Sequence, residues 1–428
     1  MKLRPISLHP VLLVVCVLPL LAACQEDDPV VTPPVDTGVT DAGDTGSLDI
    51  SPGTDAGTDA TTATDTTQDD ISDVATVPDT QGEPDSSGDV ATDTAETDAA
   101  ETDAVEPIVC EPLATDYSVA SNESWPACAS DGGRYVAFEA TISTIARIDA
   151  YETMAPLLWN NSAVPTPEDF LTARELYATD EGLGSRVSRR EDEHYPPVTD
   201  EAGTVLSCRN EGVPALDPDR CVGPAQMVPL INDAFVAGIN GVDPVVNAAR
   251  LDATFVWFMY LSTYKESVTC TSVKKDCDSS WAYYNGGTQP DEVARGLGGL
   301  VDSIAAETHD RVTDGIFAVR CWRDLDSAEV ATDLTLRDQA LLQLDTALLH
   351  GMAQLVLARM TDLEAATGVE RDADWAWLQI VGSALVREAS DRDPAAAVTI
   401  DTAFSSPSPD SVDISAVRDA ILATFPCP

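Results

Sequence analysis

The feature that most limits how this chain can fold is a long acidic segment near its start. Residues 25–109 contain 23 Asp or Glu and no Lys or Arg, mixed with Thr, Ala, Gly, Pro and Ser in units such as TDAGTDATTATD. Such a segment buries too little apolar surface to offset the entropy lost on ordering, and its like charges repel one another. We therefore expect a disordered tether here, and a folded body in residues 110–428.

Residues 1–23 have the pattern of an export signal. A basic start precedes the apolar run VLLVVCVLPLLAAC, which is too short to span a membrane. Its last four residues, LAAC, resemble the lipobox of bacterial lipoproteins. That resemblance implies a diacylglycerol on the sulfur of Cys24, cleavage before it and acylation of the new amino terminus. Gln25, where an aspartate would favour the inner membrane, implies the outer membrane, on its periplasmic or cell-surface side. The alternative is an ordinary export signal with a chance cysteine.

The body is strongly acidic even without the tether. Residues 110–428 keep 50 of the 73 acidic residues and 22 of the 24 basic residues, which gives a net charge of about −28. Nucleic acid and anionic lipid surfaces are poor partners for such a body, because both carry the same sign of charge. Metal cations and basic ligands remain candidates.

The cysteines agree with export. Eight remain after Cys24, and an even number in an exported chain is typical of a disulfide-bonded body. Short spacing favours two bridges, Cys208–Cys221 and Cys270–Cys277. The other four are then left to pair among themselves: Cys110, Cys128, Cys321 and Cys427. No double CxxC spacing of a zinc site occurs, so we expect structural bridges.

Apolar residues recur every three or four positions through most of the body, and hairpin patterns are scarce, so we predict an all-α fold. One helix begins with a near capping box, Thr166 to Asp169. A second has Asp243 as its cap and Pro244 at its first position, and its apolar run 255–261 indicates a buried central helix. Further helical patterns occupy residues 335–368, 372–389 and 411–425.

A weak internal echo suggests a duplicated helical unit. FEATISTIARIDAYE and LDATFVWFMYLSTYKE each place a tyrosine twelve residues after an acid, Glu139 to Tyr151 and Asp252 to Tyr264. A third helix, with LDTALLHGM, has Asp345 at the acidic position. Twelve residues turn a helix by about 120°, so acid and tyrosine do not share a face, and the echo concerns architecture rather than a shared site. Chance similarity between amphipathic helices is the alternative.

Asp252 and Asp345 are the most informative carboxylates, because each sits among apolar helix neighbours. A carboxylate in such a place is costly unless it is paired, hydrogen-bonded or bound to a cation. One interpretation is a metal or polar-ligand site between facing helices. The other is a structural salt bridge with an arginine such as Arg250 or Arg337.

Three histidines remain after export: His194, His309 and His350. His350 shares a helix with Asp345, and His309 lies in AAETHDR. HExxH and paired histidines at i, i+4 are absent from the mature sequence, so the usual zinc-hydrolase signature is missing. His309 and His350 remain candidate metal ligands, although a lone helical histidine is more often structural.

Catalytic motifs are also missing. The sequence has no GxSxG elbow, and RGLGGLVD lacks both the GxGxxG spacing and a preceding strand. We therefore expect that the protein is not an enzyme.

The stretch KKDCDSSWAYYNGG gathers aromatic residues in a chain that is poor in them. Trp281, Tyr283 and Tyr284 could line a ligand pocket or supply oxygen ligands to a metal. They could equally cap the core where a helix ends at Gly286 and Gly287, which is the commoner use of this pattern.

DSSWAYYNGG, ETHDRVTDGIFAVRCW and ALLQLDTALLHGMAQLVLARM follow one another in an order that resembles the algal low-iron-induced periplasmic iron-assimilation proteins. The resemblance spans residues 135–405. It implies a secreted, helical, duplicated domain associated with iron uptake, with no defined enzymatic activity. This chain differs in its lipid anchor and disulfides, and no metal ligand of that family matches residue by residue.

The sequence therefore predicts an anchored extracytoplasmic lipoprotein whose helical body binds a metal ion, with iron or another divalent cation as candidates, or a small ligand. Asp252, Asp345, His309 and His350 are the predicted metal ligands, and the three aromatics of KKDCDSSWAYYNGG are predicted to line the approach. The alternative is a structural or interaction protein that docks another component of the cell envelope.

Overall fold

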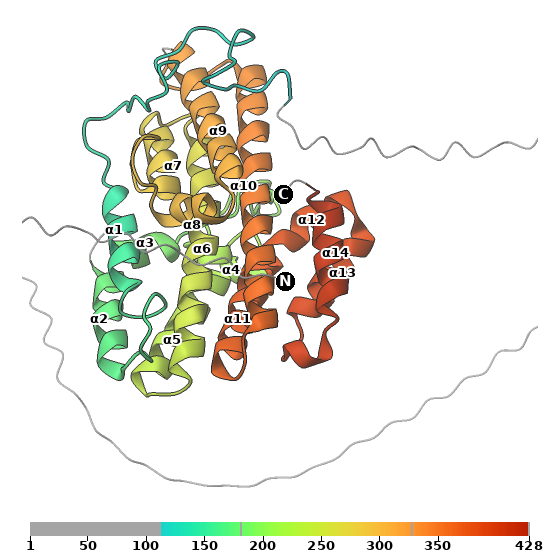
Figure 1. Ribbon diagram of the computed structural model, residues 1–428. Helices are drawn as coiled ribbons and strands as arrows, with labels where there is room; N and C mark the ends of the chain where they lie inside the picture. Colours follow the sequence, from blue (N-terminus) through green and yellow to red (C-terminus); the bar gives the residue numbers. More distant parts are fainter. Residues whose placement is uncertain (1–112, 180–181, 327, 427–428) are drawn as a thin grey trace, which may run out of the picture. The chain divides into compact units, whose positions relative to one another are not determined.

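Helices make up nearly all the regular structure of this chain (Figure 1). The computed structural model describes residues 113–179, 182–326 and 328–426. Within these ranges no strand occurs, and one isolated bridge joins Thr199 to Val205. The predicted all-α fold is confirmed. The predicted export signal, the lipidated Cys24 and the tether lie outside the described residues.

Most helices follow one another with short connections, but residues 188–212 form a long stretch between the third and fourth helices. In chain order they are α1 (Ile145–Met154), α2 (Pro167–Ala178), α3 (Leu183–Val187), α4 (Val213–Leu216), the π-helix η1 (Gly223–Met227), α5 (Val228–Ile239), α6 (Pro244–Thr269), α7 (Lys275–Asn285), α8 (Gly296–Ile304), α9 (Ala306–Leu325), α10 (Leu334–Ala365), α11 (Val369–Val381), the 3₁₀ turn η2 (Ser383–Leu385), α12 (Val386–Arg392), α13 (Pro394–Phe404), the 3₁₀ turn η3 (Pro409–Ser411) and α14 (Ile414–Thr424).

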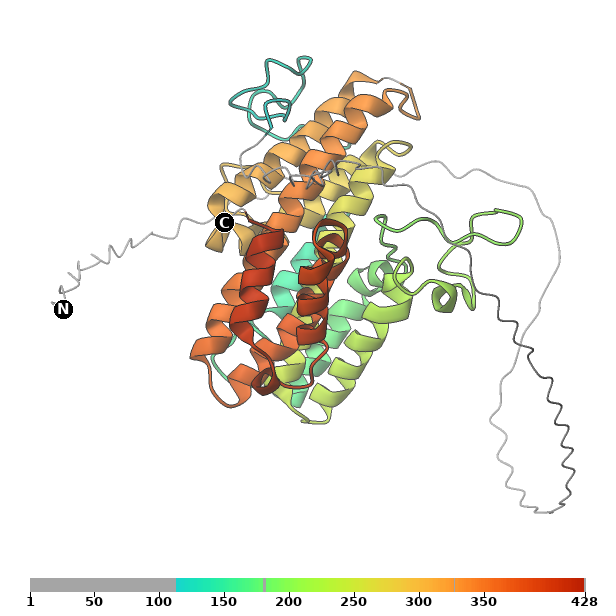
Figure 2. The ribbon, with the colours of Figure 1, turned by 90° about the vertical axis from the view of Figure 1, so that its right-hand side faces the viewer.

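α6 is the central helix, as predicted. It packs against α5, α7 and α11, and most of its apolar run is buried, with Phe255 and Phe258 fully enclosed. α9 and α10 lie side by side, and Figure 2 shows α13 and α14 beside each other as well. α10 is the one described helix long and apolar enough to cross a membrane, but 67% of its most apolar window is buried inside the body, as in a core helix.

The two predicted helix starts differ in outcome. The capping box of α2 is present: Thr166 Oγ1 accepts a bond from the Asp169 amide, and Asp169 Oδ2 accepts one from the Thr166 amide. Pro244 does open α6, but the predicted side-chain cap by Asp243 is wrong, because Asp243 has a left-handed backbone (φ 40°) and its carboxylate makes no capping bond. The Asn247 amide instead donates to the carbonyl of Asp243.

Three disulfides cross-link the described residues. The two predicted short-range bridges are confirmed, and a third joins α9 to the segment before α1. The bridges are Cys208–Cys221, Cys270–Cys277 and Cys128–Cys321. Cys110 and Cys427 lie outside the described residues, so their pairing stays a prediction.

Candidate functional site

Asp252 is a buried carboxylate held by two neutral donors from other helices. The Tyr151 hydroxyl of α1 donates to Oδ1 at 2.9 Å, and the Trp377 indole of α11 donates to Oδ2 at 2.9 Å. The residue is only 5% exposed. Burial raises the pKa of Asp252, while nearby Arg359 and the two hydrogen bonds act in the opposite direction. Both oxygens of this buried carboxylate therefore have the hydrogen-bond partners that burial requires.

Asp252 lies in the wall of a cleft of about 630 Å³. The cleft is bounded by α1, the 158–165 loop, α6, the start of α8, α10 and α11. Aromatic side chains form much of it, since Tyr151, Trp159 and Trp377 all line it. A concave, partly apolar space with a few converging polar groups is the usual form of a small-molecule site.

The nearest cation to Asp252 is Arg359 of α10, not the predicted Arg250. Arg359 Nη2 lies 3.9 Å from Asp252 Oδ2, while Nη1 forms an ion pair with Asp374 of α11 at 3.0 Å. Its guanidinium stacks over the Trp377 ring, 4.8 Å from the ring centre. Arg250 instead donates to the side chain of Asn247 on its own helix.

The carboxylate of Asp345 is paired with a histidine, His194. His194 Nε2 donates to Asp345 Oδ1 at 3.0 Å, and Nδ1 donates to Asp192 at 2.6 Å. Burial lowers the pKa of His194, but the two carboxylates outweigh burial and raise it to about 9, so the ring is protonated at neutral pH. Tyr264 of α6 stacks on this imidazole at 4.0 Å. Arg337, the other arginine named as a candidate partner for these carboxylates, pairs with Asp338.

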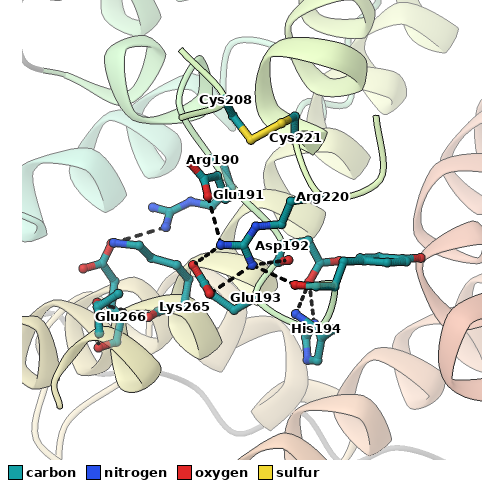
Figure 3. A network of polar contacts seen from close by, with 12 residues as sticks. Arg190, Glu191, Asp192, Glu193, His194, Cys208, Arg220, Cys221, Lys265 and Glu266 are labelled. Atoms are coloured by element: carbon teal, nitrogen blue, oxygen red, sulfur yellow. Dashed lines mark hydrogen bonds and ion pairs between the residues drawn. A yellow bond between two sulfur atoms is a disulfide. The ribbon is translucent and has the colours of Figure 1, made fainter. Parts of the chain in front are cut away.

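The segment that carries His194 is itself fixed by a buried arginine, as Figure 3 shows. Arg220 forms ion pairs with Glu191 and Glu193, both at 2.9 Å, and donates to the backbone carbonyl of Asp192. Cys221, which follows Arg220 in the sequence, is joined to Cys208 by a disulfide. Because the His194 side chain is 4% exposed, we regard this network as structural.

The four predicted metal ligands do not converge. Asp345 adjoins Tyr264 through His194, and Tyr264 lies twelve residues, or about 18 Å, along α6 from Asp252. His309 has Tyr284 as its partner, with 3.1 Å between Nδ1 and the hydroxyl. His350 is buried, its Nε2 has no hydrogen-bond partner, and burial together with Arg392 and Arg311 lowers its pKa to about 4.

The three predicted pocket aromatics belong to the core. Trp281, Tyr283 and Tyr284 lie on α7 and are at most 4% exposed, and the helix ends at Gly286 with φ 71°. Trp281 stacks on Tyr135 at 4.2 Å. The core-capping interpretation of this stretch therefore describes their placement. Tyr283 also lines a separate small pocket of about 140 Å³, and the aromatic walls of the Asp252 cleft come from Tyr151, Trp159 and Trp377.

The sequence echo has a structural counterpart. Tyr151, the tyrosine of the first repeat, bonds directly to Asp252, the acid of the second. Tyr264, the tyrosine of the second repeat, stacks on the histidine that binds Asp345, the acid of the third. Each tyrosine thus contacts the acid of the following segment, directly or through a histidine, rather than the acid of its own segment.

Arg359, Trp377 and His194 are the important residues that the sequence analysis missed. Each acts across more than a hundred residues of chain, and the one local signal was the acid-rich REDEH around His194. No protein-family model, curated protein or solved structure matches this chain. The geometry of the cleft is therefore the basis for the functional assignment.

Proposed function

We propose that this chain is a lipid-anchored protein of the outer membrane whose helical body binds a small organic ligand in the cleft beside Asp252. The observation that carries the proposal is a buried carboxylate in the wall of a 630 Å³ cleft that is lined by three aromatic side chains. We propose binding rather than catalysis because the described side chains that line the cleft form no nucleophile–base arrangement.

An organic ligand fits this site better than a metal ion. Both oxygens of Asp252 already accept N–H or O–H donors, and a guanidinium stands nearby, so a metal would have to displace favourable contacts. Asp345 is likewise engaged by a protonated histidine. Among the described residues, the one group of three potential metal-binding side chains is Cys128, Asp131 and Cys321, and its two sulfurs are bonded to each other.

The proposed location is supported by two observations. The LAAC pattern ending at Cys24 is placed where a lipobox belongs, directly after the apolar run. The three disulfides agree with an oxidising, extracytoplasmic compartment. In this proposal the acidic tether sets the body away from the membrane.

The binding proposal is tested by obstructing the cleft mouth. Ala163 is exposed and lies on the loop that borders the cleft, so Ala163→Trp fills the opening without disturbing the core. Ala202→Trp is the matched control, because Ala202 is exposed on a loop that does not border the cleft. Compounds that raise the melting temperature of the full chain in a small-molecule screen are expected to bind wild type and Ala202→Trp, but not Ala163→Trp.

The opposite results would favour the scaffold alternative. If no compound stabilises the wild-type chain, or if every stabilising compound acts equally on Ala163→Trp, the cleft is not a binding site. A protein that docks another envelope component would then be the better account of the helical body.

A further inference from the structure

The cleft has more acidic than basic side chains, and some of these side chains are held by hydrogen bonds or ion pairs with other groups. Among the described residues that line it, four are acidic and two are basic: Glu152, Asp252, Glu370, Asp374, Arg295 and Arg359. Arg295 is held outside the centre by Asp149 at 2.6 Å, and Glu152 accepts the Gly296 amide at 2.7 Å. Asp252, Asp374 and Trp377 lie around the other guanidinium of the cleft, that of Arg359.

The Arg359 guanidinium lies in a site formed by Asp252, Asp374 and Trp377, which is called the receptor below. The side chains of Asp252 and Asp374 are 7% and 12% exposed, whereas the Arg359 side chain is 31% exposed; Trp377 is buried. Two carboxylates and the face of an indole are the groups that proteins use to hold guanidinium and ammonium ions. The acceptors are thus buried and rigidly placed, and the cation is the component with access to solvent.

The match between Arg359 and this receptor is incomplete. Arg359 makes a close ion pair with Asp374, but its distance of 3.9 Å to Asp252 is too long for a hydrogen bond. Asp252 is otherwise served by neutral donors. The negative charge of Asp252 is therefore only partly compensated by its surroundings.

We propose that the cleft binds an organic cation, a guanidinium or alkylammonium group. In the absence of this ligand the Arg359 side chain occupies the same position, so it competes with the ligand. The ligand cation binds over Trp377 between Asp252 and Asp374, and the Arg359 side chain turns out toward solvent. This inference rests on the proposed function and specifies its ligand class. An anionic ligand is disfavoured by the excess of acid in the cleft and by the negative charge of the whole body.

Removal of the competitor tests the inference without knowledge of the natural ligand. Arg359→Ala leaves an empty guanidinium position, which ethylguanidinium can occupy, while ethylurea has a similar shape but no charge. Calorimetry on the full chain is expected to show saturable 1:1 binding of ethylguanidinium to Arg359→Ala, at least tenfold tighter than to wild type, and no binding of ethylurea. Arg418→Ala is the control, because Arg418 lies on α14 and pairs with Glu364 outside the cleft.

Two further variants keep the test decisive. Arg359→Met retains the apolar stem and serves if Arg359→Ala does not fold. Adding Asp374→Asn to Arg359→Met is expected to weaken ethylguanidinium binding again. The inference is overturned if both Arg359 variants bind ethylguanidinium no better than Arg418→Ala, or if ethylurea binds equally well.

This outcome is separable from that of the proposed function. If Ala163→Trp abolishes ligand binding but the Arg359 variants gain no affinity for ethylguanidinium, the cleft binds ligands of another class. If the Arg359 variants gain affinity but no compound in the screen is sensitive to Ala163→Trp, the cation position exists and the proposed function fails.

Discussion

At the scale of single residues, Asp252 and Asp345 meet the same electrostatic problem with different partners. Asp252 relies on a phenol and an indole, with a guanidinium close by. Asp345 relies on a protonated imidazole that a second carboxylate also holds. The first arrangement borders a cleft and leaves part of the charge uncompensated, whereas in the second a protonated imidazole pairs directly with the Asp345 carboxylate. This difference is why we assign ligand binding to Asp252 and structural stabilisation to Asp345.

The charge state of His194 predicts a pH-dependent stability. Its folded pKa of about 9 lies above the unfolded value of about 6.5, so its contribution is complete below pH 6.5 and is lost as the pH rises through 9. We expect the free energy of unfolding of the full chain, measured with urea, to fall by about 3 kcal/mol over this range. His194→Gln should lack that decline.

The free energy of unfolding below pH 6.5 provides an internal control. Burial lowers the folded pKa of His350 to about 4, so its contribution is lost as the pH falls from about 6.5 toward 4, in wild type and in His194→Gln alike. Parallel curves for the two proteins between pH 6.5 and 9 would contradict the assignment of His194 as a protonated partner of Asp345.

The sequence identified which carboxylates needed partners but not which partners they have. Apolar neighbours at helical spacing mark Asp252 and Asp345 as buried, and that inference is local. Their partners lie 101 residues away for Tyr151, 125 for Trp377 and 151 for His194. Such pairings depend on how the helices pack, which the pattern of one helix does not contain.

At the scale of helices, short-range signals located the helices but not every cap, since the side-chain cap predicted for Asp243 is absent. The Thr166 capping box needs only the geometry of one turn, and it formed as predicted. The patterns 335–368 and 372–389 were right as helices but wrong in their ends. α10 stops at Ala365, and the second segment breaks after Val381. Gly382 lies at that break, where a side chain would come within 2.3 Å of the Phe404 ring.

Close packing between α2 and α5 gives a prediction for a single methyl group. A Cβ on Gly238 would lie 2.3 Å from the Phe170 ring, which is fully buried. We expect Gly238→Ala to lower the free energy of unfolding by about 1–3 kcal/mol, because an overfilled core must shift. Chemical denaturation monitored by tryptophan fluorescence measures this.

Gly351→Ala is the matched control within a helix. Its nearest contact would be 3.2 Å, to the Val301 side chain, which can yield, and alanine is the better helix former. We expect this variant to stay within about 1 kcal/mol of wild type. Equal losses in the two glycine variants would show that the α2–α5 contact is looser than described.

At the scale of the whole molecule, charge and architecture point to the same class of ligand. The helical body carries a net charge of about −28, so its field draws cations toward it and repels nucleic acids and acidic surfaces. Composition alone had left metal cations and basic ligands as candidates. The position of the cleft could not be predicted, because its walls come from five helices and a loop that are far apart in the sequence.

The most direct test of the account is native mass spectrometry, with metal analysis, of the full chain purified from its native membrane. We predict one organic, amine- or guanidine-containing molecule per protein chain, which is absent from Ala163→Trp, and no stoichiometric metal. A stoichiometric metal ion with no organic molecule would contradict the account and restore the metal-binding interpretation.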